Sequence, residues 1–425
     1  MEDRIDSELF DKEKFKRQID IIKEVSDIAQ KRIDYDAAHN DDIIRAIEIV
    51  EHFLQKKHRL CYGGQAVNAH LPKKYKFYDP ETSIPDYDFF TPNQDIDINI
   101  LVRDLTRAGF TEISVREGVH EGTIKIYVDY IPVADMTQMD PKLYKILSKR
   151  EFKIDGISYL DANTLRMLMY LELSRPRGEV SRWPKIFERL ILFNEFASFK
   201  PCSLANTNVN KLNIKQLRLT MNYIIKNKRI FAGADLLDFY NTSLHKKLYT
   251  KWIFSTKKPI IFYSSEPDND AHILQSECSA VNTGKSIKIK SYSSKMEIVP
   301  SIKLITQGKN NLIYIINETA CHSYFNIPIE NNVLRIASID TLISLYFSLG
   351  FIDSKLFNIG SIECLANKLV EISSKARMDP KYPMPFISIK CVGYQPSFSS
   401  LIRKKVKRQT EKKKELRKMI TLKRG

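Results

Sequence analysis

Two aspartates, Asp86 and Asp88, are the residues of this sequence best suited to chemistry. They stand in Asp-Tyr-Asp-Phe-Phe, and this alternation of acids and aromatics is typical of a β-strand, which places both carboxylates on one face. A solvated turn does not need the aromatic residues, whereas a strand that anchors a metal site does. A third carboxylate would come from a neighbouring strand, with Asp129 and Asp135 as the candidates.

Such a set of acids can hold two divalent cations, Mg²⁺ or Mn²⁺, because hard cations prefer carboxylate oxygens. Two ions stabilise the attacking and leaving oxygens when a nucleotide is joined to a 3′-hydroxyl. The acids follow a glycine turn, Gly63-Gly64, where backbone N–H groups can approach a triphosphate because no Cβ intervenes. This order predicts nucleotidyl transfer by two-metal-ion catalysis.

A rival acid pair, Asp95 and Asp97, is expected to lie on a helix instead. Leu101 and Leu105 continue an apolar row at helical spacing, and Gly109 stands where a left-handed residue would end that helix. We therefore do not assign this pair to the site.

The surrounding elements are predicted from periodicity. A helix behind a cap at Asn40 or Asp41 leads into a strand at 60–62, and one or two strands are expected in 124–136, with Pro132 at a bend or an edge. Two helices are expected in 161–199, broken around Pro176 and Gly178. Beyond residue 255, strand-like runs at 259–263, 286–290 and 312–316 precede a helix at 338–349.

These elements suggest five segments in an α/β (α+β) chain. They are a helical N-terminal segment (1–58), a catalytic domain (59–200), a helical connector (201–255), a second mixed domain (256–400) and a basic tail (401–425). The helix at 338–349 echoes residues 162–168 at an offset of 177 residues. The echo indicates either a duplicated domain whose second copy lacks the acid pair or two ordinary amphipathic helices.

Charge and composition narrow the class of protein. The net charge is +16, and residues 403–425 hold twelve Lys and Arg against Glu411 and Glu415, so the tail is either a phosphate-binding arm or a solvated, disordered end. The six cysteines lie far apart and are expected to be reduced thiols, neither disulfide-bonded nor zinc-bound. An N-terminus without an apolar segment, and the lack of any run near the ~20 apolar residues of a membrane span, predict a soluble intracellular protein with no membrane contact.

Four motifs resemble the poly(A) polymerase catalytic subunits of giant viruses, asfarviruses and, more distantly, poxviruses. They are Tyr-Gly-Gly-Gln-Ala (62–66), Pro-Asp-Tyr-Asp-Phe-Phe-Thr-Pro-Asn (85–93), Val-Ala-Asp-Met-Thr (133–137) and Glu-Leu-Ser-Arg-Pro-Arg-Gly-Glu-Val-Ser-Arg-Trp-Pro-Lys (172–185). The resemblance covers residues 40–200 and continues more loosely to the tail.

The resemblance implies a polymerase-β-like nucleotidyltransferase domain followed by a degenerate copy. It implies Asp86, Asp88 and Asp135 as catalytic metal ligands, and it favours Asp135 over Asp129 as the third acid. Further nucleotide-binding residues are expected from the glycine turn and from the last motif: Gly63, Gly64, Gln65, Arg182 and Lys185. As structural alternatives, Arg182 could pair with Glu179 or stack on Trp183.

RNA contacts are expected from basic residues outside the acid set. The loop between the glycine turn and Asp86 mixes lysines with tyrosines as single-strand contacts do, although such a composition is more often that of a solvated loop. The candidates are Lys73, Lys74, Arg175, Arg177, Arg403, Lys404 and Lys405.

The expected activity is the transfer of AMP from ATP to an mRNA 3′ end. A uridylyltransferase, an oligoadenylate synthase or a non-catalytic RNA-binding processivity subunit are the alternatives. The resemblance further suggests a homodimer, or else a separate processivity subunit as in poxviruses, and a place in the cytoplasmic viral factory of an infected host cell and in the virion.

Overall fold

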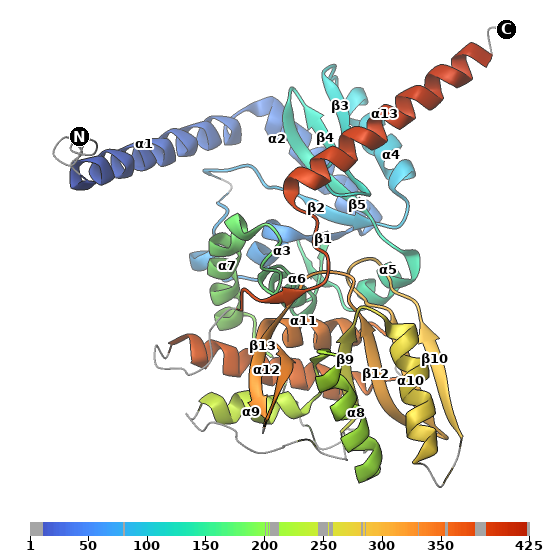
Figure 1. Ribbon diagram of the computed structural model, residues 1–425. Coiled ribbons are helices and arrows are strands. Elements are labelled where there is room, and N and C mark those ends of the chain that lie inside the picture. The colour runs from blue at the N-terminus through green and yellow to red at the C-terminus, as the bar shows by residue number, and fades with distance from the viewer. Residues whose placement is uncertain are drawn as a thin grey trace, which may run out of the picture.

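The computed structural model describes residues 12–422, apart from residues 80, 200, 203, 205–211, 245–253, 255–257, 282–283, 285, 330, 353–355 and 379–387. Two α/β units lie one above the other, each built around its own mixed sheet, and a long helix extends from the body near each end of the chain (Figure 1). No helix in these residues is long and apolar enough to cross a membrane.

The N-terminal segment is helical from residue 12 onward, as predicted for 1–58, and residues 1–11 lie outside the described part of the chain. It consists of α1 (Lys12–Ala38) and α2 (Asp41–Lys57). Asn40 caps α2, because its side chain accepts hydrogen bonds from the backbone N–H groups of Asp42 and Ile43 at 3.0 and 3.1 Å. The apolar row of α2 is buried against the first unit, and the helix ends at His58 in the left-handed conformation.

The first unit contains a seven-stranded sheet in the order β3-β4-β5-β2-β1-β7-β6. Its strands are β1 (Leu60–Tyr62), β2 (Asp88–Thr91), β3 (Ile113–Glu117), β4 (Thr123–Val128), β5 (Ile131–Gln138), β6 (Phe152–Ile154) and β7 (Ile157–Tyr159). Its helices are α3 (Gly63–Ala69), α4 (Gln94–Arg107), α5 (Pro141–Ser148), α6 (Ala162–Leu173) and α7 (Trp183–Phe196), with short 3₁₀ turns at Lys73–Tyr75 and Val180–Arg182. The predicted strands and both helices of residues 161–199 are confirmed, and Asp95 and Asp97 do lie on a helix, α4.

The second unit has an eight-stranded sheet in the order β10-β11-β12-β9-β8-β14-β13-β15. Its strands are β8 (Ile230–Phe231), β9 (Ile260–Ser264), β10 (Ile287–Tyr292), β11 (Ile302–Gln307), β12 (Asn310–Asn317), β13 (His322–Ile329), β14 (Asn332–Ala337) and β15 (Cys391–Val392). Its helices are α8 (Ile214–Lys226), α9 (Asp235–Leu244), α10 (Pro267–Ala280), α11 (Ile339–Leu349) and α12 (Ile359–Met378), and α13 (Phe398–Leu422) follows β15. The three strand-like runs and the helix predicted beyond residue 255 are confirmed.

The two sheets repeat one topology. The first seven strands of the second sheet follow the order of the first sheet, with the same parallel and antiparallel pairings. Cys61 pairs with Tyr159 across β1 and β7, and Phe231 pairs with Ile336 across β8 and β14. The second residues of these two pairs, Tyr159 and Ile336, therefore occupy equivalent positions, and they are 177 residues apart, which is the offset seen in the sequence. The offset therefore reflects a duplicated domain.

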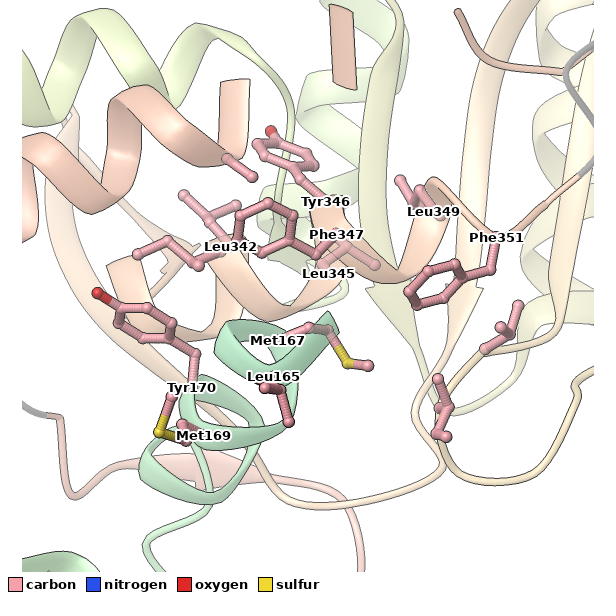
Figure 2. Close-up of a cluster of buried hydrophobic side chains, with 14 of the residues drawn as sticks. Leu165, Met167, Met169, Tyr170, Leu342, Leu345, Tyr346, Phe347, Leu349 and Phe351 are labelled. Atoms are coloured by element: carbon pink, nitrogen blue, oxygen red, sulfur yellow. The ribbon is translucent and has the colours of Figure 1, made fainter. Parts of the chain in front are cut away.

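The repeated helices α6 and α11 pack against each other where the units meet. Figure 2 shows their apolar side chains in one cluster, and all of those labelled on both helices are buried. Burial of this apolar surface holds the two units together. A backbone hydrogen bond from Ser323 N–H to the carbonyl of Ser174, at 3.2 Å, joins the units nearby.

A buried ion pair is also repeated in the two units. Arg59 binds both carboxylate oxygens of Asp97 at 2.7 and 2.9 Å in the first unit. In the second unit, Arg229 binds Asp270 at 2.8 Å. Both aspartates are fully buried, and each arginine directly follows a left-handed residue and precedes the first strand of its sheet. These pairs fix the first strand of each sheet to the helix after its second strand.

Three expectations about organisation need correction. The second unit begins before residue 256, because β8 lies inside the segment expected to be a helical connector (201–255) and pairs with β9 and β14. Asp86 precedes β2 rather than lying in it, since the strand begins at Asp88. The basic tail is neither a disordered end nor confined to 401–425: its helix α13 begins at Phe398, and its side chains are described as far as residue 415.

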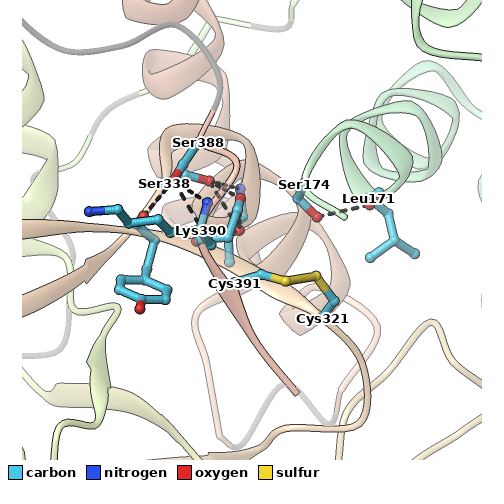
Figure 3. The surroundings of a disulfide bond; sticks show 10 residues. Leu171, Ser174, Cys321, Ser338, Ser388, Lys390 and Cys391 are labelled. Atoms are coloured by element: carbon cyan, nitrogen blue, oxygen red, sulfur yellow. Dashed lines mark hydrogen bonds between the residues drawn. A yellow bond between two sulfur atoms is a disulfide. The ribbon is translucent and has the colours of Figure 1, made fainter. Parts of the chain in front are cut away.

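Four of the six cysteines are paired, contrary to the expectation of reduced thiols. Disulfides join Cys202 to Cys364 and Cys321 to Cys391, whereas Cys61 and Cys278 are buried thiols. The partners are separated by 162 and 70 residues, so sequence spacing gave no indication of them. Figure 3 shows that the second disulfide lies beside Ser174 at the end of α6, where the two units meet.

The repeated ion pair allows a stability test. Replacing Arg59 by Met should lower the free energy of unfolding by roughly 3 kcal/mol, because it leaves the Asp97 carboxylate buried without its counter-charge. The double variant Arg59→Met with Asp97→Leu should recover most of that loss. Denaturant unfolding measures both changes, and a loss below about 1 kcal/mol for the single variant would contradict the assigned role.

Candidate active site

The sheet register sets two of the three predicted acids side by side. β2 and β5 are parallel neighbours, and Asp88 lies directly opposite Asp135. The backbone N–H of Asp135 donates to the carbonyl of Tyr87 at 3.0 Å, which extends this pairing by one residue. Opposed residues of neighbouring strands point to the same face, so the two carboxylates share one side of the sheet.

Asp86 joins them from the loop, although it is not in the strand. The backbone N–H of Asp88 donates to the carbonyl of Asp86 at 3.2 Å, so the chain turns sharply just before β2. Asp129 is placed elsewhere: it lies with Tyr130 in the exposed hairpin turn between β4 and β5, and both have positive φ. Of the two candidates for the third acid, only Asp135 lies with the pair.

All three acids line one cleft of about 560 Å³ in the first unit. Burial and the neighbouring carboxylates of Asp86 and Asp135 raise the pKa of Asp88 to about 8. Burial also raises the pKa of Asp135, although Lys125 opposes that shift. The cleft therefore disfavours several negative charges at once and favours a cation between them.

Lys125 supplies one such cation. Its ammonium group forms an ion pair with Asp135 from the adjacent strand β4. Among the residues that the structure describes, no group of three or more His, Cys, Asp or Glu side chains is arranged so that it could hold a metal ion. The acids thus have the donor chemistry for divalent cations, with Lys125 balancing the charge of one of them.

The glycine turn directly faces the acids. Gly63 has φ of +72°, and a Cβ there would collide with the Asp88 carboxylate. A Cβ on Gly64 would lie 2.7 Å from the Tyr78 hydroxyl and 2.8 Å from Nη1 of Arg189. Without a Cβ, Gly63 leaves room for the Asp88 carboxylate and Gly64 leaves room for the Arg189 guanidinium. The turn therefore needs a glycine at both positions.

A row of cations that begins at the N-cap of α7 and continues along that helix also lines the cleft. Arg182 and Lys185 line it as predicted, and Arg189, one further turn along the same face, lines it with them. Burial, together with repulsion from Arg189 and Arg182, lowers the pKa of Lys185. Such mutual repulsion disposes the row to bind an anion.

Arg189 was not predicted from the sequence. Its Nη2 donates to the Tyr78 hydroxyl at 2.8 Å, and its guanidinium lies 4.6 Å from the Phe77 ring centroid. The signal was its spacing of seven residues from Arg182, which continues the helical face of Arg182 and Lys185. Arg182 also has the predicted alternative partner, Glu179, at 3.6 Å, as well as Glu172 at 3.7 Å.

The other predicted residues are scattered. Gln65 lines a separate cavity of about 70 Å³ rather than the cleft. Arg175 lines the cleft and pairs with Glu297 of the second unit at 3.0 Å, whereas Arg177 is exposed and does not line it. Lys73 and Lys74 are exposed in a 3₁₀ turn away from the cleft.

The tail helix α13 borders the cleft. Phe398, its first residue, is part of the cleft lining. Arg408 lies 3.7 Å from Glu121, and Lys412 forms an ion pair with Glu117, which attaches the helix to the β3–β4 hairpin (Figure 1). The three predicted tail residues do not line the cleft: Arg403 and Lys404 are exposed, and Lys405 is half-buried.

Comparison with known proteins shows what most of the first unit is similar to. Residues 48–179 match the model of the family described as poly(A) polymerase catalytic subunit. This chain resembles the viral poly(A) polymerase catalytic subunits. The matched segment of the poly(A) polymerase family holds the glycine turn and all three acids of the cleft, while the cations of α7 lie beyond it.

Individual relatives show the same similarity. A protein of African swine fever virus (strain Badajoz 1971 Vero-adapted), named for this subunit, is 31% identical over 173 residues, which cover 40% of this chain and 36% of that protein. One from Acanthamoeba polyphaga mimivirus is 30% identical over 152 residues, 34% of this chain and 25% of that protein. The match thus spans about a third or less of each relative.

The whole fold has a solved counterpart. The crystal structure of the Megavirus polyadenylate synthase superposes with a TM-score of 0.75 over 98% of this chain and 86% of that chain, at 16% identity. The likeness at this identity concerns the fold, and it confirms the predicted α/β class across both units.

The crowded acids give the stability of the metal-free protein a defined pH dependence. Asp88 keeps its proton up to a pH near 8 in the folded state but loses it near pH 4 when unfolded. Between these values the folded state binds more protons, so the free energy of unfolding falls as the pH rises. The variant Asp88→Asn should therefore melt about 1–3 °C higher than the wild type at pH 8.

That gain should shrink toward pH 5, where the wild type is protonated at Asp88, and calorimetry at the two pH values measures it. Glu81→Gln changes an exposed acid of the preceding loop and serves as the control. Equal melting temperatures for Asp88→Asn and the wild type at pH 8 would contradict the crowding of the three acids.

Proposed function

We propose that this chain transfers AMP from ATP to the 3′-hydroxyl of mRNA, releasing pyrophosphate. The observation that carries the proposal is the convergence of three acids, a glycine turn and a row of cations on one cleft. Similarity to the poly(A) polymerase catalytic subunits supports ATP as the nucleotide and RNA as the acceptor.

Two Mg²⁺ or Mn²⁺ ions would be held by Asp86, Asp88 and Asp135. The fit rests on the acids themselves: burial, followed by repulsion from Asp86 and Asp135, raises the pKa of Asp88, and the Lys125 ammonium already lies beside Asp135 as a counter-charge. When bound, such ions stabilise charge on the attacking and leaving oxygens and lower the pKa of the attacking hydroxyl, so no histidine base is required.

The rest of the cleft would position the triphosphate. The backbone N–H groups of Gly63 and Gly64 can approach phosphate oxygens without steric hindrance, and Arg182, Lys185 and Arg189 offer positive charge from α7. Arg189 is held by the Tyr78 hydroxyl, so its guanidinium is already oriented before the nucleotide arrives. Pre-orientation reduces the entropy lost on binding.

The RNA would approach along α13. This helix begins at the cleft with Phe398 and presents basic side chains from residue 403 onward, among them the exposed Arg403 and Lys404. Neutralised phosphates release counterions, so affinity for RNA should be strongly salt-dependent but independent of sequence. Lys73 and Lys74 would offer a secondary contact.

We further infer self-association. The resemblance suggests a homodimer, or alternatively a separate processivity subunit, and α1 offers a surface for either. Ile22, Ile28 and Ile33 on this 27-residue helix are each more than 60% exposed, which is unusual for isoleucine. A place in the cytoplasmic viral factory and in the virion, inferred from the same resemblance, completes the proposal.

Primer extension tests the proposed reaction. The wild type with Mg²⁺ should extend an unstructured RNA with ATP in preference to the other three nucleotides, and Asp86→Ala with Asp88→Ala should abolish extension while RNA binding persists. A preference for UTP would favour a uridylyltransferase, and primer-independent products would favour an oligoadenylate synthase. Undiminished extension by the double variant would refute the assigned site.

Arg189 should affect nucleotide binding. Arg189→Ala is expected to raise KM for ATP about tenfold or more, because it removes a charge-assisted contact to the triphosphate and the partner of Tyr78. Tyr78→Phe removes the same hydrogen bond but keeps the cation, so its KM should change less. Steady-state kinetics on a fixed RNA primer measure both, and equal effects of the two variants would assign Arg189 a structural role only.

A further inference from the structure

The second unit contains its own cavity at the place equivalent to the cleft. This cavity of about 270 Å³ lies among α9, β9, β12, α11 and the start of α12, as the cleft lies among the repeated elements of the first unit. The strand registers make the equivalence exact enough to compare single positions. Ile261 lies opposite Tyr314 across β9 and β12, as Asp88 lies opposite Asp135 across β2 and β5.

Every charge that the proposed reaction needs is absent from this second cavity. The three positions of the acids are occupied by Pro259, Ile261 and Tyr314, all of which line the cavity. Alignment of the first turn of α12 with that of α7 places Asn358, Ser361 and Leu365 at the positions of the three α7 cations, and these also line it.

The charge at the rim is compensated. Lys258 lies 2.8 Å from Asp238 and 3.9 Å from Asp235, so its ammonium is already matched by two carboxylates. Among the described lining residues, a phosphate group would find no cation that is not already paired. The nearby carboxylates would also repel it. The cavity therefore selects against anions and against a metal–triphosphate complex.

The walls are suited to a flat ring. The rings of Tyr314 and Phe357 stack at a centroid distance of 4.6 Å on one side, and Tyr346 of α11, seen in Figure 2, lines the cavity as well. The two tyrosine hydroxyls donate to backbone carbonyls, of Leu356 at 3.0 Å and of Ala232 at 2.9 Å, so both rings are held in place. Aromatic faces favour planar, polarisable ligands.

Polar groups lie beside these rings. Asn311, Asn358 and Ser361 line the same cavity and can donate and accept hydrogen bonds without carrying charge. A largely apolar cavity with a few uncharged polar groups is the usual form of a site for a small neutral molecule. With about half the volume of the cleft, it suits a ligand smaller than a nucleoside triphosphate.

We propose that the second unit binds an uncharged purine nucleoside or nucleobase in this cavity, which lies at the position of the cleft but is smaller and lacks the cleft's phosphate-binding and metal-binding side chains. The site does not depend on the proposed polymerase reaction, since none of its lining residues belongs to the cleft. Adenosine is the probe, with a dissociation constant of about 0.1 mM expected for a ligand of its size.

Photolabelling of the wild-type chain with 8-azidoadenosine locates the site. Peptide mapping should place the label on peptides that carry Tyr314 or Phe357, and excess adenosine should suppress this label. AMP should suppress it at least tenfold less effectively, because it adds a phosphate that the cavity disfavours. Label confined to residues of the cleft, or equal competition by AMP, would overturn the proposal.

A cavity-filling variant provides the second measurement. Leu365→Trp should weaken adenosine binding at least tenfold in equilibrium dialysis, because the larger ring occupies the cavity. Ile273→Trp introduces the same ring at a half-exposed position of α10 outside the cavity and should change binding less than twofold. Unchanged binding in a folded Leu365→Trp protein would overturn the proposal, and the photolabelling decides it if that variant does not fold.

Discussion

Repulsion among three carboxylates, held together by the pairing of β2 with β5, is the constraint on which the first unit depends. The register places Asp88 opposite Asp135, and the chain reversal before β2 adds Asp86. This arrangement costs stability, as the raised pKa of Asp88 shows. The surroundings compensate with cations from two directions, Lys125 in the sheet and the row on α7. The glycine turn gives both kinds of charge room to approach.

Comparison of the two duplicated units separates the residues that stabilise the fold from those proposed to act in the reaction. Both units have the same sheet order. Both also have the buried ion pair between an arginine before the first strand and an aspartate on the helix after the second strand. Only the first unit keeps the acids and the cations of α7. The ion pairs therefore stabilise the fold, whereas the charged residues of the cleft have their proposed role in the reaction. In place of the charged cleft the second unit has an apolar cavity, and its helix α11 packs against α6 of the first unit.

Patterns within a single element were readable from the sequence. Helical spacing correctly predicted that Asp95 and Asp97 lie on a helix, and the cap at Asn40 was confirmed. The offset of 177 residues pointed to the duplication because it joins two helices that begin after equivalent strands. A second signal was present but missed: Arg59 and Arg229 each precede an aliphatic residue, and each is followed four residues later by a glycine.

Features that depend on contacts between distant segments could not be read in this way. The disulfides join cysteines far apart in sequence, and the two residues of β8 are too few to show a period. Attachment of α13 to the β3–β4 hairpin depends on Glu117 and Glu121, which have no sequence relation to the tail. The roles of the site residues likewise stay predictions until they are measured.

Anomalous diffraction from crystals grown with Mn²⁺ and a non-hydrolysable ATP analogue tests the central claim most directly. The account predicts manganese density within bonding distance of the Asp88 and Asp135 carboxylates, with the Lys125 ammonium withdrawn from Asp135. Manganese bound only at other acids of the chain, or an intact Lys125–Asp135 ion pair beside a bound nucleotide, would contradict it.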